Sequence, residues 1–140
     1  MKKLYYAALA YGILGLAAGL FYRDYTKLND FTGSTQLVVM HTHLFALGML
    51  VMLIVLVLER LFTLSKTKWF NLFFWHYNAG LLLTVAMMLV IGLRDVAGEP
   101  SLPMINGIAG LGHIILSIAI VFLFIALGKQ VLPMDKASAK

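Results

Sequence analysis

Four long apolar segments, separated by short polar stretches, make up most of the chain. They run from Leu4 to Tyr22, from Gln36 to Leu58, from Trp69 to Leu93 and from Met104 to Leu127, and none contains Lys, Arg, Asp or Glu. Because a helix rises about 1.5 Å per residue, about 20 residues cross the hydrocarbon of a bilayer. The short connections favour antiparallel neighbours. We therefore expect one all-α domain, an integral membrane antiparallel four-helix bundle.

The composition agrees with a lipid environment. Hydrophobic residues make up 61% of the chain and charged residues 12%, and the mean hydropathy is +0.91. A soluble domain carries roughly 25% charged residues, so a soluble fold is excluded. The chain has no cysteine, which excludes disulfides, thiolate metal sites, iron–sulfur clusters and covalent haem attachment.

Basic residues are divided unevenly between the two ends of the expected bundle. Lys and Arg near helix ends are retained in the cytoplasm, so we expect both termini there, and lipid rather than nucleic acid as the partner. The first segment has no clear small-residue cleavage site at its end, which favours a membrane span over a cleaved signal peptide. The termini and the second connection hold Lys2, Lys3, Arg60, Lys66, Lys68, Lys129, Lys136 and Lys140, and the other two connections hold Arg23, Lys27 and Arg94.

Three residues mark expected helix boundaries. Ser34 is of a type that caps helices and precedes the second segment. Pro103 suits the first turn of the fourth helix, and Pro133 is expected beyond its end.

Small residues share one face of the first segment. Ala8, Gly12, Gly15 and Gly19 are three or four positions apart, and such residues allow helices to approach closely in lipid. We expect this face to pack against another helix, with contact to a flat cofactor as the alternative.

All four histidines lie inside the apolar segments. Neutral imidazole is the commonest metal ligand, and ionisable residues in a membrane indicate a functional site. In the expected topology His41, His43 and His113 lie in the outer half of the membrane and His76 in the inner half. This distribution predicts one metal centre between the second and fourth helices, with His76 as a structural residue or an alternate ligand.

The second segment can direct only one of its histidines at that centre, because at about 100° per residue His41 and His43 point about 200° apart. We expect His41 as the ligand, with His43 as the alternate, and His113 as its partner. Small residues beside them would leave room for a porphyrin. These are Gly48 on the face of His41, and Asn106, Ala109, Gly110 and Ser117 on the face of His113. Helix packing and backbone hydrogen bonding are the competing explanation, and for Asn71 and Asn78 we expect interhelical hydrogen bonds.

The second segment also resembles a helix of known enzymes. Leu37 to Met49, LVVMHTHLFALGM, is similar to the second transmembrane helix of haem-copper oxidase catalytic subunits, especially in the nitric oxide reductase and C-family oxidase branch. There a His-Thr-Asn stretch precedes an apolar run with glycines, and its first histidine ligates a low-spin b haem. This role would fall on His41, whereas His43 replaces the Asn. His113 matches the second ligand of that haem only by analogy. A counterpart of the binuclear copper site is absent, so no oxidase or reductase reaction is implied.

Over its whole length the chain is similar to a small bacterial family of four-span proteins of unknown function, typical of Gram-positive species, which implies a bacterial cytoplasmic membrane. We therefore expect a protein that binds haem b and acts in electron transfer or in haem or gas sensing, with a redox protein, a quinone or a second copy as candidate partners. Arg23 or Arg94 would pair with a propionate. The alternatives are a cofactor-free assembly or regulatory module and a His/Met copper or zinc handling protein. We recognise no catalytic nucleophile or acid–base pair, so a carrier or sensor is expected rather than a hydrolase or transferase.

Overall fold

The computed structural model describes residues 1–100 and 102–138, with side chains to residue 133. The described residues form four long helical spans and no strand, as expected for an all-α bundle. The first span is α1 (Lys2–Leu28), and the second consists of α2 (Leu37–His43), the π-helix η1 (Leu44–Leu50) and α3 (Val51–Phe62). The short 3₁₀-helix η2 (Leu64–Lys66) leads to the third span, α4 (Lys68–Val96), and the fourth is α5 (Pro103–Ser138).

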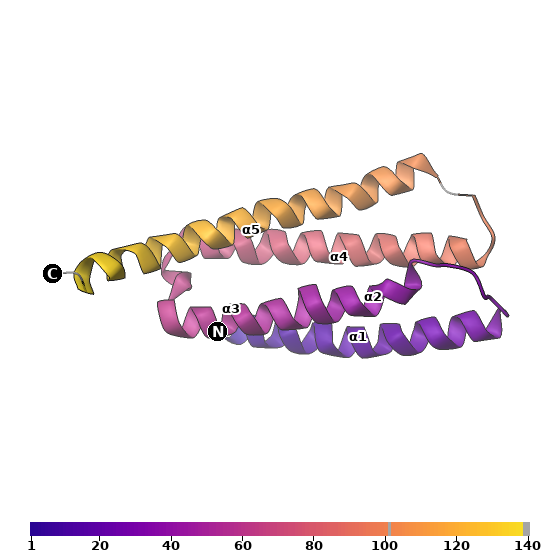
Figure 1. Ribbon diagram of the computed structural model, residues 1–140, viewed down its shortest axis with the longest axis horizontal. Helices are drawn as coiled ribbons and strands as arrows, with labels where there is room; N and C mark the ends of the chain where they lie inside the picture. Colours follow the sequence, from indigo (N-terminus) through magenta and orange to yellow (C-terminus); the bar gives the residue numbers. More distant parts are fainter. Residues whose placement is uncertain (101, 139–140) are drawn as a thin grey trace.

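The four spans run up and down, so that both ends of the chain lie at the same end of the bundle (Figure 1). All four are long and apolar enough to cross a membrane. The fold class expected from the sequence is therefore confirmed, and the protein is a multi-pass membrane protein by helix length and composition.

The start of the second span differs from the expectation. Ser34 is not the cap, because α2 begins after Gln36. The backbone N–H of Gln36 donates to Asp95 Oδ2 at 3.1 Å, and the Thr35 hydroxyl accepts from Leu37 N at 3.3 Å while donating to Gly92 O at 2.9 Å. A carboxylate from α4 and the hydroxyl of Thr35 thus share the role that the sequence alone assigned to Ser34.

The two prolines of α5 led to one correct and one wrong expectation. Pro103 is the first residue of the helix, as expected. Pro133 lies inside α5 and not beyond it. A proline removes one backbone hydrogen bond from a helix, and near the end of a long span this single loss does not terminate it.

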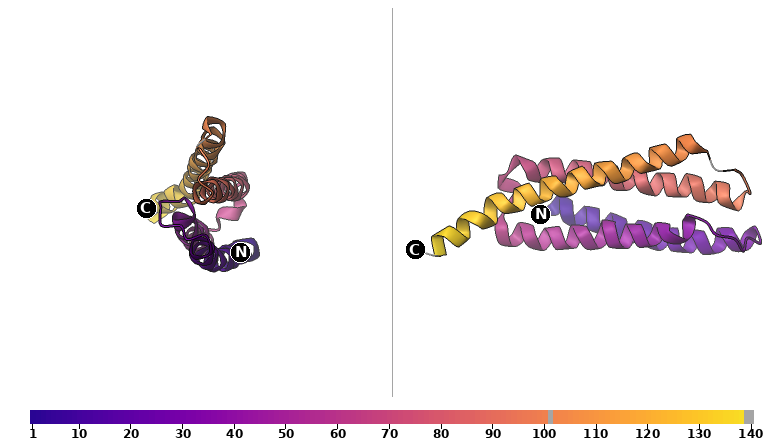
Figure 2. Two further views of the ribbon diagram at one scale, coloured as in Figure 1. Left: turned by 90° about the vertical axis from the view of Figure 1, so that its right-hand side faces the viewer. Right: turned by 45° about the horizontal axis from the view of Figure 1, so that its top comes forward.

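The spans form two hairpins, which the end-on view of Figure 2 separates clearly. In one hairpin α1 packs against α2, η1 and α3, and in the other α4 packs against α5. The glycines of α1 make the first contact close. A Cβ on Gly12 would lie 3.2 Å from Met49 Sδ, one on Gly15 would lie 2.9 Å from the Phe45 ring, and one on Gly19 would lie 3.8 Å from His41 Cβ. The small-residue face of α1 is therefore a helix-packing surface, as expected.

Side-chain hydrogen bonds join the two hairpins. The hydroxyl of Tyr11 donates to Asn78 Oδ1 at 2.7 Å, and Lys3 Nζ donates to Asn71 Oδ1 at 3.1 Å. Both asparagines thus link helices, as expected. These bonds fix α1 against α4 in the half of the bundle that carries the termini.

Candidate functional site

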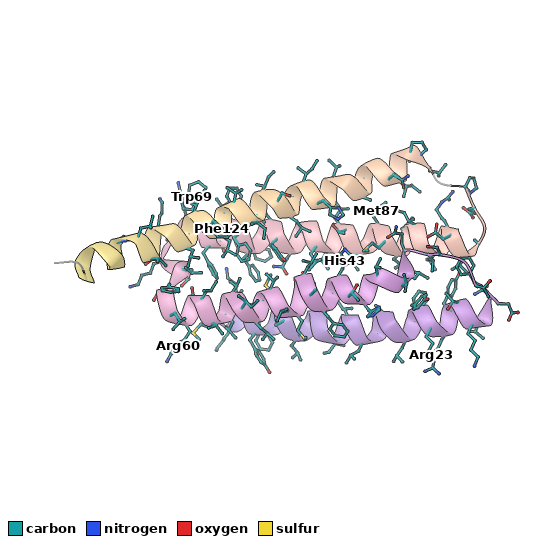
Figure 3. All side chains as sticks on the ribbon, in the orientation of Figure 1. Arg23, His43, Arg60, Trp69, Met87 and Phe124 are labelled. Carbon is teal, nitrogen blue, oxygen red and sulfur yellow. The ribbon has the colours of Figure 1, made fainter. Side chains whose placement is uncertain are left out.

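A cavity of about 370 Å³ lies between α2, α4 and α5, in the half of the bundle opposite the termini. Its wall combines apolar side chains with a small number of polar ones, which is typical of ligand sites. Figure 3 shows His43 projecting from α2 toward α4 and α5. The lining residues are Gln36, Val39, His43, Thr84, Met88, Ile91, Asn106, Ala109 and His113.

The two histidines of this cavity come from different hairpins. His43 Nδ1 lies 2.9 Å from Val39 O, and His113 Nδ1 lies 3.3 Å from Ala109 O. A carbonyl oxygen only accepts, so each Nδ1 carries the proton and donates it to the preceding turn of its own helix. The Nε2 atom of each ring then keeps its lone pair. This is the tautomer in which histidine ligates a metal, with Nδ1–H oriented by a backbone carbonyl.

The positions of His43 and His113 along their helices correspond in depth. His43 is the last residue of α2, seven positions after the N-cap, and His113 is ten positions after Pro103. At the helical rise these residues lie roughly 10 and 15 Å from the ends of their spans. Both rings therefore occupy the same half of the membrane.

The polar residue that α4 contributes to the cavity, Thr84, is hydrogen-bonded within its own helix. Thr84 Oγ1 donates to Gly80 O at 2.9 Å. A Cβ on Gly80 would lie 2.9 Å from Leu116 N, so α4 and α5 are in close backbone contact here. Toward Pro103, α5 leans away from the rest of the bundle (Figures 1 and 2). The close contact of α4 and α5 at Gly80 thus lies beside the Thr84 wall of the cavity.

His41, the ligand expected from the sequence, points elsewhere. It faces Gly19 of α1, its ring is edge-on to Phe45 at 6.4 Å, and it does not line the cavity. Its Nδ1 is buried without a hydrogen-bond partner among the described residues. The alternate, His43, is the histidine of this pair that shares a cavity with His113.

His76 lies in the other half of the bundle, apart from the cavity. Its Nδ1 donates to Leu72 O at 2.8 Å, and its ring packs edge-to-face on Phe122 at 5.3 Å. This position agrees with a structural role between α4 and α5.

The small residues expected beside a porphyrin are placed differently from one another. Gly48 lies against α1, where a Cβ would meet Tyr11 Cγ at 2.6 Å, so it serves helix packing. Gly110 has open space beside it within the described structure, and the hydroxyl of Ser117 donates to His113 O at 2.8 Å. None of these three lines the cavity, although Asn106 and Ala109 do.

The two arginines considered for a ligand carboxylate also differ. Arg94 forms an ion pair with Glu99 and donates to Pro100 O at 2.9 Å. It borders a small cleft that shares Ile91 and Asn106 with the histidine cavity. Arg23 lies on α1, which contributes nothing to the cavity lining (Figure 3). Of the two, Arg94 is therefore the one placed near the cavity.

The π-helix that follows His43 was not expected from the sequence. Within η1 the carbonyl of Leu47 accepts a hydrogen bond from the Tyr77 hydroxyl at 3.0 Å. A π-helix bonds residues five apart and is frequent at functional sites. Neither residue carries a sequence signal for this contact, because it depends on how α4 meets the second span.

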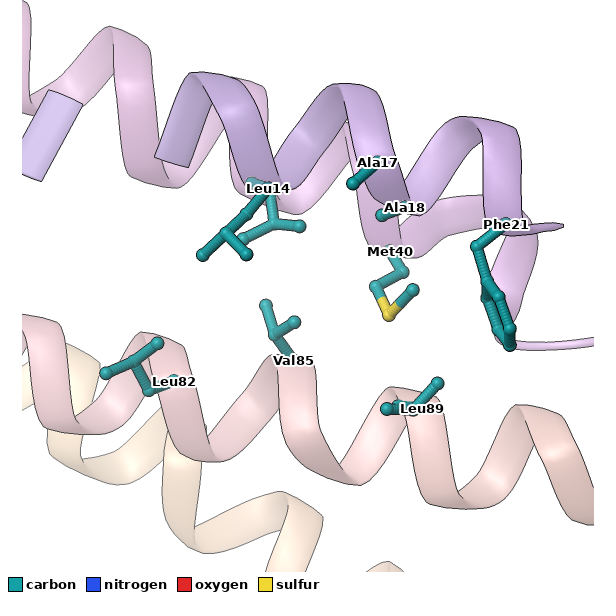
Figure 4. Close-up of a pocket in the computed structure, with 9 residues that line it drawn as sticks. Leu14, Ala17, Ala18, Phe21, Met40, Leu82, Val85 and Leu89 are labelled. Carbon is teal, nitrogen blue, oxygen red and sulfur yellow. The ribbon is translucent and has the colours of Figure 1, made fainter. Parts of the chain in front are cut away.

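A second cavity, of about 310 Å³, offers a contrast. It lies between α1, α2 and α4, and Figure 4 shows its wall of aliphatic and aromatic side chains with Met40 at its centre. A binding site needs a few polar groups to orient its ligand, and this wall has none. The full lining is Leu14, Ala17, Ala18, Phe21, Met40, Leu44, Leu82, Val85 and Leu89.

The part of the chain that the structure describes contains no group of three or more His, Cys, Asp or Glu side chains that could hold an ion. Zinc sites use three or four such ligands. These residues therefore offer no zinc site of that kind.

No curated protein and no solved structure matched the chain. A family model matches residues 1–130, nearly the whole chain, and its description is "protein of unknown function (DUF2871)". The chain, a four-span membrane protein with two histidines facing one cavity, belongs to the DUF2871 family.

Proposed function

We propose that this protein binds one b-type haem in the cavity between α2, α4 and α5, with His43 and His113 as the axial ligands. The observation that carries the proposal is that imidazoles from two separate spans line the same cavity, each with Nδ1–H donated to a backbone carbonyl. His43 is preferred to His41 because His41 faces α1.

The cavity would enclose part of this ligand, and the rest of the macrocycle would extend out of its open side. Its volume of about 370 Å³ is at the lower end of small-molecule sites, which span roughly 300–1,000 Å³. His113 lines the cavity and is exposed, so the cavity is open toward lipid on the side of α5. The apolar edge of a macrocycle can contact lipid there, whereas a polar ligand would lose its hydration at a cost in free energy.

A bis-histidine haem supplies one-electron redox chemistry without an open iron position, which favours electron transfer over oxygen chemistry. The role of the protein would be to orient the two imidazoles and to shield the haem from water. Val39 and Ala109 carbonyls hold the two imidazoles in the ligating tautomer, and Met88 and Ile91 exclude water from the cavity. If only one of the two histidines ligated the iron, the proposed function would be sensing of haem or of a gas.

Arg94 is the candidate partner of a haem propionate. It already holds a carboxylate, that of Glu99, beside a cleft that shares Ile91 and Asn106 with the cavity. Guanidinium suits carboxylates geometrically. A propionate would take the position of Glu99 on Arg94, at the polar end of the site where an anion need not enter hydrocarbon.

The orientation of the chain across the membrane is also part of the proposal. Arg60, Lys66, Lys68 and Lys129 all lie at the end of the bundle that carries the termini. The retention of basic residues in the cytoplasm supports cytoplasmic termini and a haem near the outer face of a bacterial membrane. A quinone or a redox protein is then the expected electron partner.

A haem titration of the purified chain tests the proposal. We expect one haem per chain and a Soret band that His43→Ala or His113→Ala removes. His41→Ala and His76→Ala are matched controls and should keep it. In His113→Gly, millimolar free imidazole should restore the band, because it can fill the space left by the ring. A Soret band that survives both alanine changes, or no haem uptake by the wild type, would refute the assignment.

Met88 supports a second candidate. Its thioether lines the same cavity as the two imidazoles, and imidazole and thioether ligands together suit Cu(I). Elemental analysis of protein loaded with Cu(I) separates the candidates, since a copper site should lose its ion in Met88→Leu, whereas a bis-histidine haem should be retained.

A further inference from the structure

We propose that the end of the bundle that carries the termini holds a site for an anionic phospholipid headgroup, between Lys68 and Lys129 beside Trp69. This proposal is independent of the haem. Lys68 Nζ and Lys129 Nζ each lie 5.7 Å from the centre of the Trp69 ring. The two lysines come from different helices, α4 and α5, and neither is buried.

The indole between them is firmly held. Trp69 is half-buried and packs against Phe122 of α5, with the ring centres 5.6 Å apart. Trp75, by contrast, is 63% exposed on the same helix. Tryptophan at the level of lipid headgroups is a common anchor, and here both ammonium groups lie near its ring.

No carboxylate forms an ion pair with either lysine within residues 1–100 and 102–133. Among the side chains that the structure describes at this end of the bundle, the acidic one is Glu59, which is 6% exposed. Its two oxygens accept hydrogen bonds from Ser65 N at 2.8 Å and Ser65 Oγ at 2.6 Å. Among the described side chains, Lys68 and Lys129 thus have no anionic partner. A phosphodiester beside Trp69 would supply one.

The membrane is the source of anion that fits this position. Trp69 and the lysines lie where the apolar spans end, so a phospholipid can present its phosphate to both ammonium groups while its acyl chains follow the exposed apolar faces of α4 and α5. Each lysine near a membrane surface contributes about 1 kcal/mol of attraction to anionic lipid, so two contribute a preference of about 30-fold over a zwitterionic lipid.

Fluorescence quenching of Trp69 tests the site directly. The full chain carrying Trp75→Phe, so that Trp69 is the sole tryptophan, is placed in nanodiscs that contain increasing fractions of brominated phosphatidylglycerol or brominated phosphatidylcholine. We expect phosphatidylglycerol to quench at a mole fraction about 30-fold lower. The pair Lys68→Gln/Lys129→Gln should remove this preference, and the control pair Arg60→Gln/Lys66→Gln should keep it.

The opposite outcomes are equally clear. Equal quenching by the two lipids, or a phosphatidylglycerol preference that persists in Lys68→Gln/Lys129→Gln, overturns the proposal. Displacement of the brominated lipid by millimolar inorganic phosphate would assign the site to the free anion and likewise overturn the lipid assignment. Circular dichroism establishes that each variant keeps the helical content of the parent.

Discussion

Replacing Gly112 by alanine should weaken the contact between α4 and α5. A Cβ at this position would clash with Thr84 Oγ1 and would lie 3.0 Å from Thr84 N and 3.1 Å from Gly80 O. The two backbone atoms cannot rotate away, so the helices must separate. Overpacking of this kind costs about 1–3 kcal/mol, and the gain in helix propensity from Gly to Ala returns up to about 1 kcal/mol. The two terms span a net loss of about 0–3 kcal/mol, and their midpoints predict a loss of about 1.5 kcal/mol.

Gly110 provides the matched control two residues away on the same helix. A Cβ added there would have no neighbour within 4 Å among the described residues, so Gly110→Ala should gain about 0–1 kcal/mol from propensity alone. The assay is the free energy of unfolding, measured by helical circular dichroism during titration of mixed micelles with a denaturing detergent. In the Gly112→Ala background, Thr84→Ala should recover part of the loss. Equal effects of the two glycine substitutions would show that α4 and α5 do not meet at Gly112.

Three further predictions concern the site and its surroundings. His41→Leu should leave haem binding unchanged and hold or raise the free energy of unfolding, because it removes a buried nitrogen without a partner among the described residues; a lost Soret band would make His41 the ligand. Tyr77→Phe should cost about 1–3 kcal/mol in the same unfolding assay, because the Leu47 carbonyl loses its donor, and an unchanged stability would contradict this contact. Arg94→Gln should lower the affinity for haem by about tenfold, whereas Arg23→Gln should not, as measured by haem titration; equal effects would remove Arg94 from the site.

The four spans could be predicted from the sequence because long stretches contain no charged residue, and the hydrocarbon of a bilayer disfavours charged side chains. The residues at which the helices begin and end could not be predicted. The helix α1 continues to Leu28, well past the apolar segment that ends at Tyr22, since hydrogen bonding of the backbone does not stop where the hydrocarbon does. The start of α2 depends in part on Asp95, which accepts a hydrogen bond from Gln36 and is distant in sequence. No pattern of residues near Gln36 predicts this partner.

The sequence indicated that histidines of two separate spans lie near each other, but it did not indicate which of His41 and His43 lines a cavity with His113. That choice depends on how the second span is rotated. One sequence pattern does indicate that His41 faces α1. The bulky residues that contact the α1 glycines are spaced four positions apart, and they are Met49, Phe45 and His41. The π-helix η1 obscured this pattern, because bonding between residues five apart changes the rotation per residue, so a face cannot be extrapolated from α3 into α2.

Low-temperature electron paramagnetic resonance of the ferric, haem-loaded protein tests the central claim most directly. Two imidazoles on one iron predict a low-spin signal in the wild type, and His43→Ala and His113→Ala should each lose this signal together with the haem. If the low-spin signal persists in both variants, or if His41→Ala alone abolishes it, then His43 and His113 do not share an iron.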